Sequence, residues 1–350
     1  MRFVLPAALG ALLVAVTCLP MRAISEASFR RTRDWFLLGM LAVATLAACR
    51  WALPFAPLGV YFLARWRDAT TVPSLVVWLA LGGLWAGLGA LPWWGWAWVA
   101  VGWLGVGTYV SGCLVWEYLR ADRGVNPRWH PFRYLDTARA WFGQRTLAAA
   151  FLALLLPFFP GWSKLIPLAG LLVTCSWTAL LGALGAMIVL EPRWAIPAAL
   201  IVALVGSAAL WWPKILWLTP RGNSLDSVGQ RVTMCRLLWR AMTQRAWWPW
   251  GYGPRSMTRA IMVWAVDLGP AAVTLGNAHM EPGQFAYEYG PLGVLALALL
   301  GWQVLPALRW GDPWSAAWVA GALVACGALP CRAVSTGVPW LAISAYLAHR

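Results

Sequence analysis

Residues 277–302 read NAHMEPGQFAYEYGPLGVLALALLGW, a polar stretch that runs directly into an apolar one. The polar part holds a histidine, side-chain amides, two carboxylates and three glycines before the apolar run begins at Val294. Polar groups packed against the start of a membrane span are costly and are usually retained for function. Gln284 and Glu288 lie four residues apart and would share a helix face, with His279 just before that helix. We therefore interpret this stretch as the functional site.

The composition is that of a polytopic membrane protein. Of 350 residues, 61% are hydrophobic and only 11% are charged. The net charge of +15 comes from arginines between apolar runs, so membrane topology and anionic head groups explain it better than nucleic acid does. The first apolar run, 3–20, could pass for a signal peptide. We interpret it as a retained span because no small-residue cleavage site follows it.

The apolar runs predict an all-α, polytopic integral membrane protein with about eleven (ten to twelve) transmembrane helices. The segment 35–64 could be one kinked helix, but the placement of arginines in the loops along the chain favours two. The expected spans are 3–20, 35–49, 51–64, 72–91, 93–116, 146–160, 163–190, 194–212, 286–307, 314–330 and 334–349.

The distribution of arginine predicts the orientation of these spans. The loop 117–145 holds six arginines, which makes its side cytoplasmic, whereas the short loops on the other side hold few basic residues. The long segment 213–285 then lies outside, with an external N-terminus and a cytoplasmic C-terminus. We predict a single membrane domain, 1–350, whose external loop 213–285 carries the site and contains an amphipathic helix.

That helix is expected over Arg231–Ala246, at about 100° per residue. Arg231 falls inside its apolar stripe. Either the arginine snorkels outward along its stem, or it faces the protein and awaits an anionic ligand. Arg236 and Arg240 are expected to face lipid or water. The predicted apolar stripe is Val232, Cys235, Leu238, Trp239, Met242 and Ala246.

A turn is predicted at Pro249–Pro254, because glycine and proline are dense there. Arg255 follows this turn and is a candidate for binding substrate. The segment shows no cysteine and histidine spacing for a metal and no phosphate-binding loop for a nucleotide. We therefore expect neither a catalytic metal nor a cofactor.

The order and spacing of five residues resemble the C-terminal signature of the O-antigen ligase superfamily, which includes lipopolysaccharide O-antigen ligases and related polysaccharide polymerases. Upstream, Arg231 and the turn at 249–253 look like the arginine and glycine-turn segment of that family. The resemblance is specific over about 220–305, and the first 160 residues match only as generic spans. The five residues are His279, Gln284, Glu288, Gly290 and Gly293.

Two departures from the family pattern stand out. The residue after the histidine is usually Asn, Ser or Gln, and here it is Met280. The family commonly shows Thr-x-Ser-Arg inside an earlier span, and this chain has Trp177 in place of the arginine. Either another basic residue substitutes (Lys164, Lys214 or Arg221), or the acceptor differs, or the protein is catalytically degenerate.

The resemblance implies a membrane glycosyltransferase. It would move a glycan from an undecaprenyl-diphosphate carrier to a hydroxyl of a glycan or lipid A-core-type acceptor, at the periplasmic face of a bacterial inner membrane. His279 would act as the base and Arg231 would bind the departing phosphates. The alternatives are a polymerase of the same superfamily or a degenerate membrane scaffold or carrier. The substrate-binding residues would be Arg221, Arg255, Gln284 and Glu288.

Overall fold

The computed structural model describes part of the chain, and that part is helical, without a strand. It divides into two compact units, which are described separately below. The first unit contains 1–23, 92–228 and 308–343, and the second contains 24–91, 229–307 and 344–350. The described residues are 61, 85, 88–89, 91–120, 145–174, 176–194, 197, 223–254, 256–264, 280–327 and 334–350.

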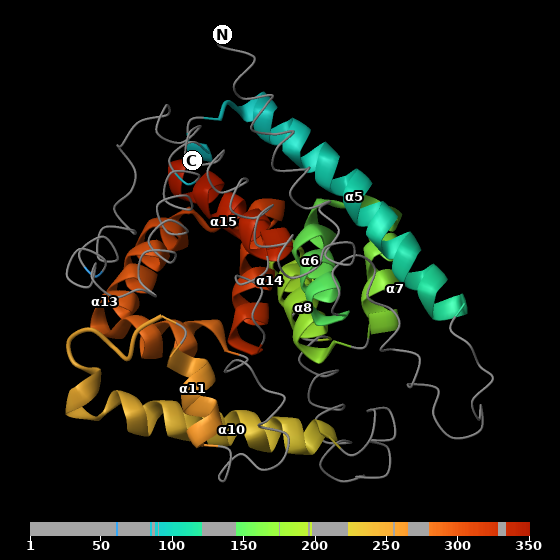
Figure 1. Cartoon of the computed structure of the whole chain (residues 1–350). Coiled ribbons are helices and arrows are strands. Elements are labelled where there is room, and N and C mark those ends of the chain that lie inside the picture. Colours follow the sequence, from blue (N-terminus) through green and yellow to red (C-terminus); the bar gives the residue numbers. More distant parts are fainter. Residues whose placement is uncertain are drawn as a thin grey trace, which may run out of the picture. The chain divides into compact units, whose positions relative to one another are not determined.

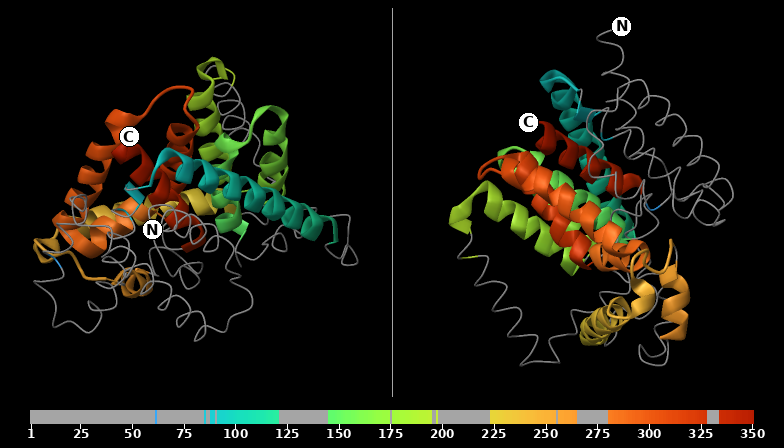
Figure 2. Two further views of the ribbon diagram at one scale, coloured as in Figure 1. Left: turned by 90° about the horizontal axis from the view of Figure 1, so that it is seen from above. Right: turned by 90° about the vertical axis from the view of Figure 1, so that its left-hand side faces the viewer.

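The first unit is a group of packed helices around α6 (Figures 1 and 2). Each described residue from Ala148 to Leu156 is buried, as expected for a helix that is apolar on all sides. α6 contacts α5, α7, α8 and α14. The helices of this unit are α5 (Trp93–Arg120), α6 (Arg145–Leu155), α7 (Leu165–Thr174), α8 (Trp177–Leu190), α14 (Pro313–Gly327) and the first part of α15 (Val334–His349).

The packing of α8 against α14 depends on small residues. A Cβ atom on Gly182 would lie 2.7 Å from Val324 Cγ2 and 2.8 Å from the carbonyl oxygen of Ala320. Ala316 and Ala320 are fully buried at the same contact. Small side chains let two helix backbones approach closely, which is a common way for helices to associate in membranes.

The prediction of one continuous helix over 163–190 is wrong. The chain forms a 3₁₀ turn at Gly161–Lys164, then α7, and breaks at Ser176 before α8 begins. Ser176 has extended dihedral angles (φ −88°, ψ 101°), and the Thr174 hydroxyl donates to the carbonyl of Leu171 at 2.7 Å. Hydroxyl side chains compete with the helical hydrogen bonds in this way, and the long apolar segments before Thr174 and after Thr178 hid the break.

In the second unit, two consecutive helices pack against the start of a third, longer helix. α10 spans Asn223–Met242 and belongs to this unit from Gly229 onward. A 3₁₀ turn at Arg245–Trp247 and the predicted glycine and proline turn separate α10 from α11 (Ser256–Val263). α13 (Glu281–Val304) continues into a 3₁₀ turn at Leu305–Ala307. The turn predicted at 249–254 is therefore confirmed.

Two helices of the described part are long and apolar enough to cross a membrane. They are Trp93–Leu119, with 27 residues, and Pro282–Ala307, with 26 residues. The other apolar helices described are shorter, 10 to 17 residues. The expected spans at 3–20 and 35–49 lie outside the described residues, and those at 51–64, 72–91 and 194–212 are described only at isolated positions. The count of eleven and the external position of 213–285 remain predictions.

Candidate functional site

α13 begins at Glu281, two residues after His279, as the predicted shared helix face of Gln284 and Glu288 requires; the apolar span within it was predicted from residue 286. Met280 is the residue that precedes its first turn, and Pro282 occupies one of the first two helical positions. Proline is well tolerated there because its missing N–H would have no partner in the helix anyway. His279 lies outside the described residues, but the sequence puts it directly before Met280. Residues 281–288 of the polar stretch thus form the first two turns of the helix itself.

Gln284 and Glu288 form the polar centre of these turns. The Gln284 Nε2 atom donates to Glu288 Oε1 at 2.8 Å. Both side chains are buried, with 1% and 3% of their surface exposed. The predicted shared helix face is confirmed. A carboxylate is strongly destabilised by burial unless hydrogen bonds compensate it, so the amide of Gln284 helps to hold Glu288 in this position.

α13 is interrupted at Gly290, which has φ 64° and ψ −153°, and at Pro291, which has no N–H to donate. Pro291 would otherwise donate to the carbonyl of Tyr287, four residues earlier. The turn between α10 and α11 supplies donors in its place. The Tyr252 N–H donates to the Tyr287 carbonyl at 3.1 Å, and the Gly253 N–H donates to the Glu288 carbonyl at 2.9 Å. We call this pair of backbone contacts the carbonyl clasp.

The carbonyl clasp requires glycine on both sides. Gly251 also has a positive φ, 67°, and a Cβ atom there would lie 2.8 Å from the carbonyl oxygens of Tyr287 and Glu288. A Cβ atom on Gly290 would lie 2.8 Å from the carbonyl carbon of Trp250 and would meet the backbone nitrogen of Gly251. The motif glycine Gly290 therefore permits a close contact between two backbones. Sequence reasoning missed this contact, although Pro291 signalled that a carbonyl needed another donor.

Aromatic side chains support the same junction. The rings of Tyr252 and Tyr287 stack with their centroids 4.6 Å apart and an interplanar angle of 23°. The Tyr252 hydroxyl donates to the Ala241 carbonyl at 2.8 Å, and burial raises the pKa of that hydroxyl, so it stays a donor. The Trp247 indole N–H donates to the carbonyl of Ala286 at 3.0 Å. Glu288 is thus fixed by contacts on both sides of it along the chain.

The buried face of α10 differs from the predicted stripe. Met234, Leu237, Leu238 and Ala241 are buried in a cluster with α11 and Tyr287. Of the predicted stripe, Leu238 is buried and Met242 packs against the cluster. The other members are exposed, because the four buried residues already form a complete stripe at i, i+3, i+4 and i+7. The exposed members are Val232, Cys235, Trp239 and Ala246.

The structure describes the candidate arginines only in part. Arg231 lies in α10, one turn before Met234 and two turns before Leu238, so its helical position borders the buried face. Its side chain is outside the described part, as are Arg221 and Arg255. Arg236 and Arg240 are exposed, as predicted. Whether Arg231 faces a ligand stays a prediction.

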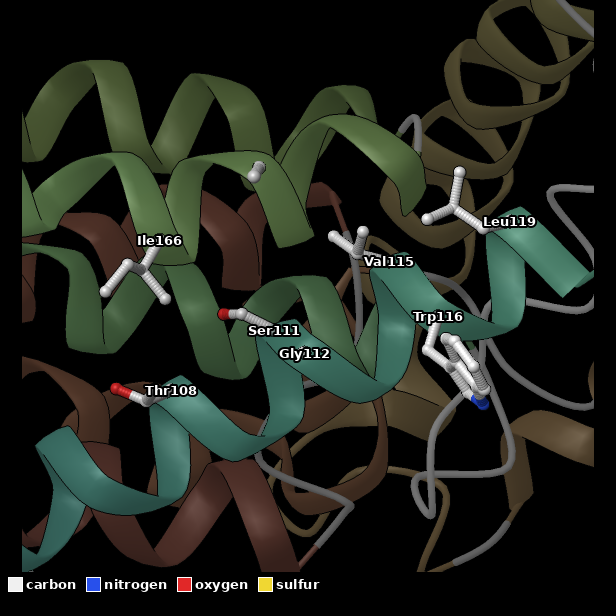
Figure 3. A pocket seen from close by; sticks show the side chains of 8 residues that line it. Thr108, Ser111, Gly112, Val115, Trp116, Leu119 and Ile166 are labelled. Atoms are coloured by element: carbon white, nitrogen blue, oxygen red, sulfur yellow. The ribbon is translucent and has the colours of Figure 1, made fainter.

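A groove of about 420 Å³ lies between α5 and α7 in the first unit (Figure 3). The two hydroxyls that line it are bonded within α5. Thr108 donates to the carbonyl of Leu104 at 2.9 Å, and Ser111 donates to that of Gly107 at 2.7 Å. The groove therefore presents mainly apolar surface, unlike the second unit's buried amide and carboxylate. It is lined by Thr108, Ser111, Gly112, Val115, Trp116, Leu119, Ile166 and Ala169.

No protein-family model matches the chain, and no curated protein sequence matches it. Within the described residues, no group of three or more histidine, cysteine, aspartate and glutamate side chains is placed to hold a metal ion. The resemblance to the O-antigen ligase superfamily therefore depends on the motif residues alone.

Proposed function

We propose that this protein is a membrane glycosyltransferase of the O-antigen ligase type. It would transfer a glycan from an undecaprenyl-diphosphate carrier to an acceptor hydroxyl at the periplasmic face of the bacterial inner membrane. The observation that carries the proposal is the buried pair Gln284 and Glu288 in the first turns of α13, five and nine residues after His279 in the chain. Buried polar groups at the mouth of an apolar helix are expensive, so a functional role is their best explanation.

In the proposed reaction the acceptor hydroxyl loses its proton to His279 as its oxygen attacks the anomeric carbon of the donor glycan. The bond between that carbon and the diphosphate oxygen breaks, and undecaprenyl diphosphate leaves with the bonding electrons. Arg231 stabilises the charge on the departing phosphates, because its planar guanidinium can donate two parallel hydrogen bonds. The diphosphate is a good leaving group, so the reaction needs no nucleotide and no metal.

Glu288 has a positioning role in this proposal. Its carboxylate is held by Gln284, and its carbonyl is held by Gly253 in the carbonyl clasp. Arg221 and Arg255 are further candidates for binding the anionic parts of the substrates. A polymerase would use the same donor chemistry with a second lipid-linked glycan as the acceptor. Met280 packs against the apolar cluster around α10, so this departure from the family pattern has a structural use here.

The transfer assay tests the proposal. Purified protein in lipid nanodiscs is supplied with an undecaprenyl-diphosphate-linked glycan and either a lipid A-core acceptor or a second lipid-linked glycan. Product on the first acceptor would identify a ligase, and a lengthened lipid-linked chain would identify a polymerase. A folded protein that leaves the donor unchanged with both acceptors would be the degenerate scaffold instead.

For Arg231, we expect replacement by alanine to weaken use of the donor far more than Arg236→Ala or Arg240→Ala. Arg231 borders the buried face of α10, whereas the two control arginines are exposed. Loss of a charge-assisted contact should remove roughly 1.5–3 kcal/mol, about 10- to 150-fold in apparent affinity. The measurement is the KM for the lipid-linked donor. An equal increase in this KM for all three variants would place Arg231 at the lipid or water surface.

The distribution of arginine among the short loops predicts which side of the membrane each loop faces. Residues 213–285 should be external and residues 117–145 cytoplasmic. Single cysteines introduced into a cysteine-free variant can be labelled in intact cells with a reagent that does not cross membranes. Labelling is expected at positions in 221–260. The orientation would be reversed if the reagent reached 120–140 and left 221–260 unlabelled.

A further inference from the structure

The exposed side of α10 carries two parallel ridges of different chemistry. At about 100° per residue, Val232, Cys235 and Trp239 form one ridge, and Arg236 and Arg240 form the next. Trp239 is 69% exposed and Val232 is 45% exposed. The opposite side of the same helix is already buried against α11 and Tyr287. The helix therefore has a second amphipathic surface that the described residues of its unit leave exposed.

The charged residues of the segment 229–264, which holds this surface, all have one sign. Residues 229–264 contain six arginines and no aspartate or glutamate. Arg245 and Arg259 are exposed, and Trp248, just beyond α10, is 68% exposed. Guanidinium groups bind phosphate oxygens with paired hydrogen bonds. Tryptophan is enriched where a membrane meets water, because its ring is apolar and its N–H is a donor. The combination is complementary to a layer of anionic lipid head groups.

The position of α10 also fits a layer of lipid head groups. The part of α10 in the second unit runs across the direction of α13, not along it (Figures 1 and 2). Its buried face touches Tyr287, which lies near the start of the candidate membrane span Pro282–Ala307. A helix that crosses the end of a membrane span lies at the level of the lipid head groups, close to the plane of the bilayer.

We propose that α10 is a membrane-surface helix whose exposed ridges dock on anionic phospholipid head groups. Val232, Cys235 and Trp239 enter the boundary between head groups and acyl chains, and Arg236 and Arg240 bind the lipid phosphates. An acidic soluble protein would meet the arginines but would leave the tryptophan ridge without an apolar partner. This docking surface is independent of the transfer chemistry proposed above.

The test uses Cys235, which lies on the apolar ridge and is exposed. The full-length protein, with its six other cysteines replaced by alanine, is placed in nanodiscs of phosphatidylcholine alone or of phosphatidylcholine with phosphatidylglycerol. The rate at which an uncharged water-soluble maleimide labels Cys235 reports how often the ridge leaves the bilayer. An uncharged reagent is needed because anionic lipid would repel or concentrate a charged one.

We expect labelling to be about tenfold slower with phosphatidylglycerol than without it, and 1 M NaCl should remove most of the difference. Arg236→Gln and Arg240→Gln should each speed labelling in anionic nanodiscs about fivefold. Arg309→Gln, an exposed arginine in the other unit, is the matched control and should leave the rate unchanged. Equal fast rates in both lipids would show that the ridge stays in water. Equal slow rates would show that protein covers it, and either result overturns the proposal.

Discussion

Replacing His279 with alanine should lower the rate of glycan transfer by about 10²–10⁴-fold, the usual contribution of a positioned general base. His279 lies two residues before the start of α13, and the buried pair Gln284 and Glu288 follows within that helix. Protein folding and membrane insertion should stay intact, because one polar side chain before a helix contributes little to either. The measurement is the initial rate of transfer in nanodiscs, with the unfolding temperature as the check on folding.

His279→Gln is the sharper variant of the same test. An amide can hydrogen-bond to substrate but cannot accept its proton, so the glutamine variant should recover little of the lost rate. The rate of the parental protein should fall as the pH drops below the ordinary histidine pKa of about 6.5, since protonated imidazole is no longer a base. If His279→Gln transfers glycan at the parental rate, the histidine only orients substrate, and positioning and phosphate electrostatics carry the reaction.

Gly290→Ala should be the most damaging small substitution in α13. Gly290 holds a backbone conformation (φ 64°, ψ −153°) that side chains rarely permit, and backbone strain of this kind costs about 1–3 kcal/mol. The added Cβ atom would also press on the backbone of Trp250, 2.8 Å away. We expect a clear drop in the unfolding temperature. Transfer should fall as well, because the carbonyl clasp that positions Glu288 must open.

Gly301→Ala is the matched control, in the same helix. A Cβ atom at Gly301 would meet only the Leu305 side chain, 3.8 Å away, which is an ordinary contact. Alanine in a helix interior is favoured over glycine by roughly 0.8–1.0 kcal/mol, so this variant should be as stable as the parent or more so. Equal unfolding temperatures for Gly290→Ala and Gly301→Ala would show that the two backbones are not in contact at Gly290.

Several features of the second unit could be predicted from local sequence. The four-residue spacing of Gln284 and Glu288 puts them on one helix face, and the structure joins them by a hydrogen bond. The density of proline and glycine at 249–254 predicts the turn that leads into α11. Such patterns succeed because helix periodicity and the backbone preferences of glycine and proline act within a few residues.

Other features depend on contacts between distant segments, which local patterns do not encode. The predicted buried face of α10 was wrong because it included Trp239, which is exposed. The face that is buried contains Leu237 and Ala241, which belong to one apolar cluster with Met257 and Tyr287. The break at Ser176 was missed because the short stretch of hydroxyl residues around it lies between two long apolar segments. The carbonyl clasp joins residues that are 35 positions apart, and only the pairing of Pro291 with a glycine-rich turn hinted at it.

The most direct test of the proposed function is a stoichiometric transfer measurement with the purified protein. Undecaprenyl-diphosphate-linked glycan and acceptor are incubated with protein in nanodiscs, and the free undecaprenyl diphosphate and the glycosylated acceptor are both quantified by mass spectrometry. If the protein transfers glycan, free undecaprenyl diphosphate and glycosylated acceptor should appear in equal amounts with the parental protein. Both should nearly vanish with His279→Ala. Product formation that is unchanged in His279→Ala, or an unconsumed donor with every acceptor, would contradict it.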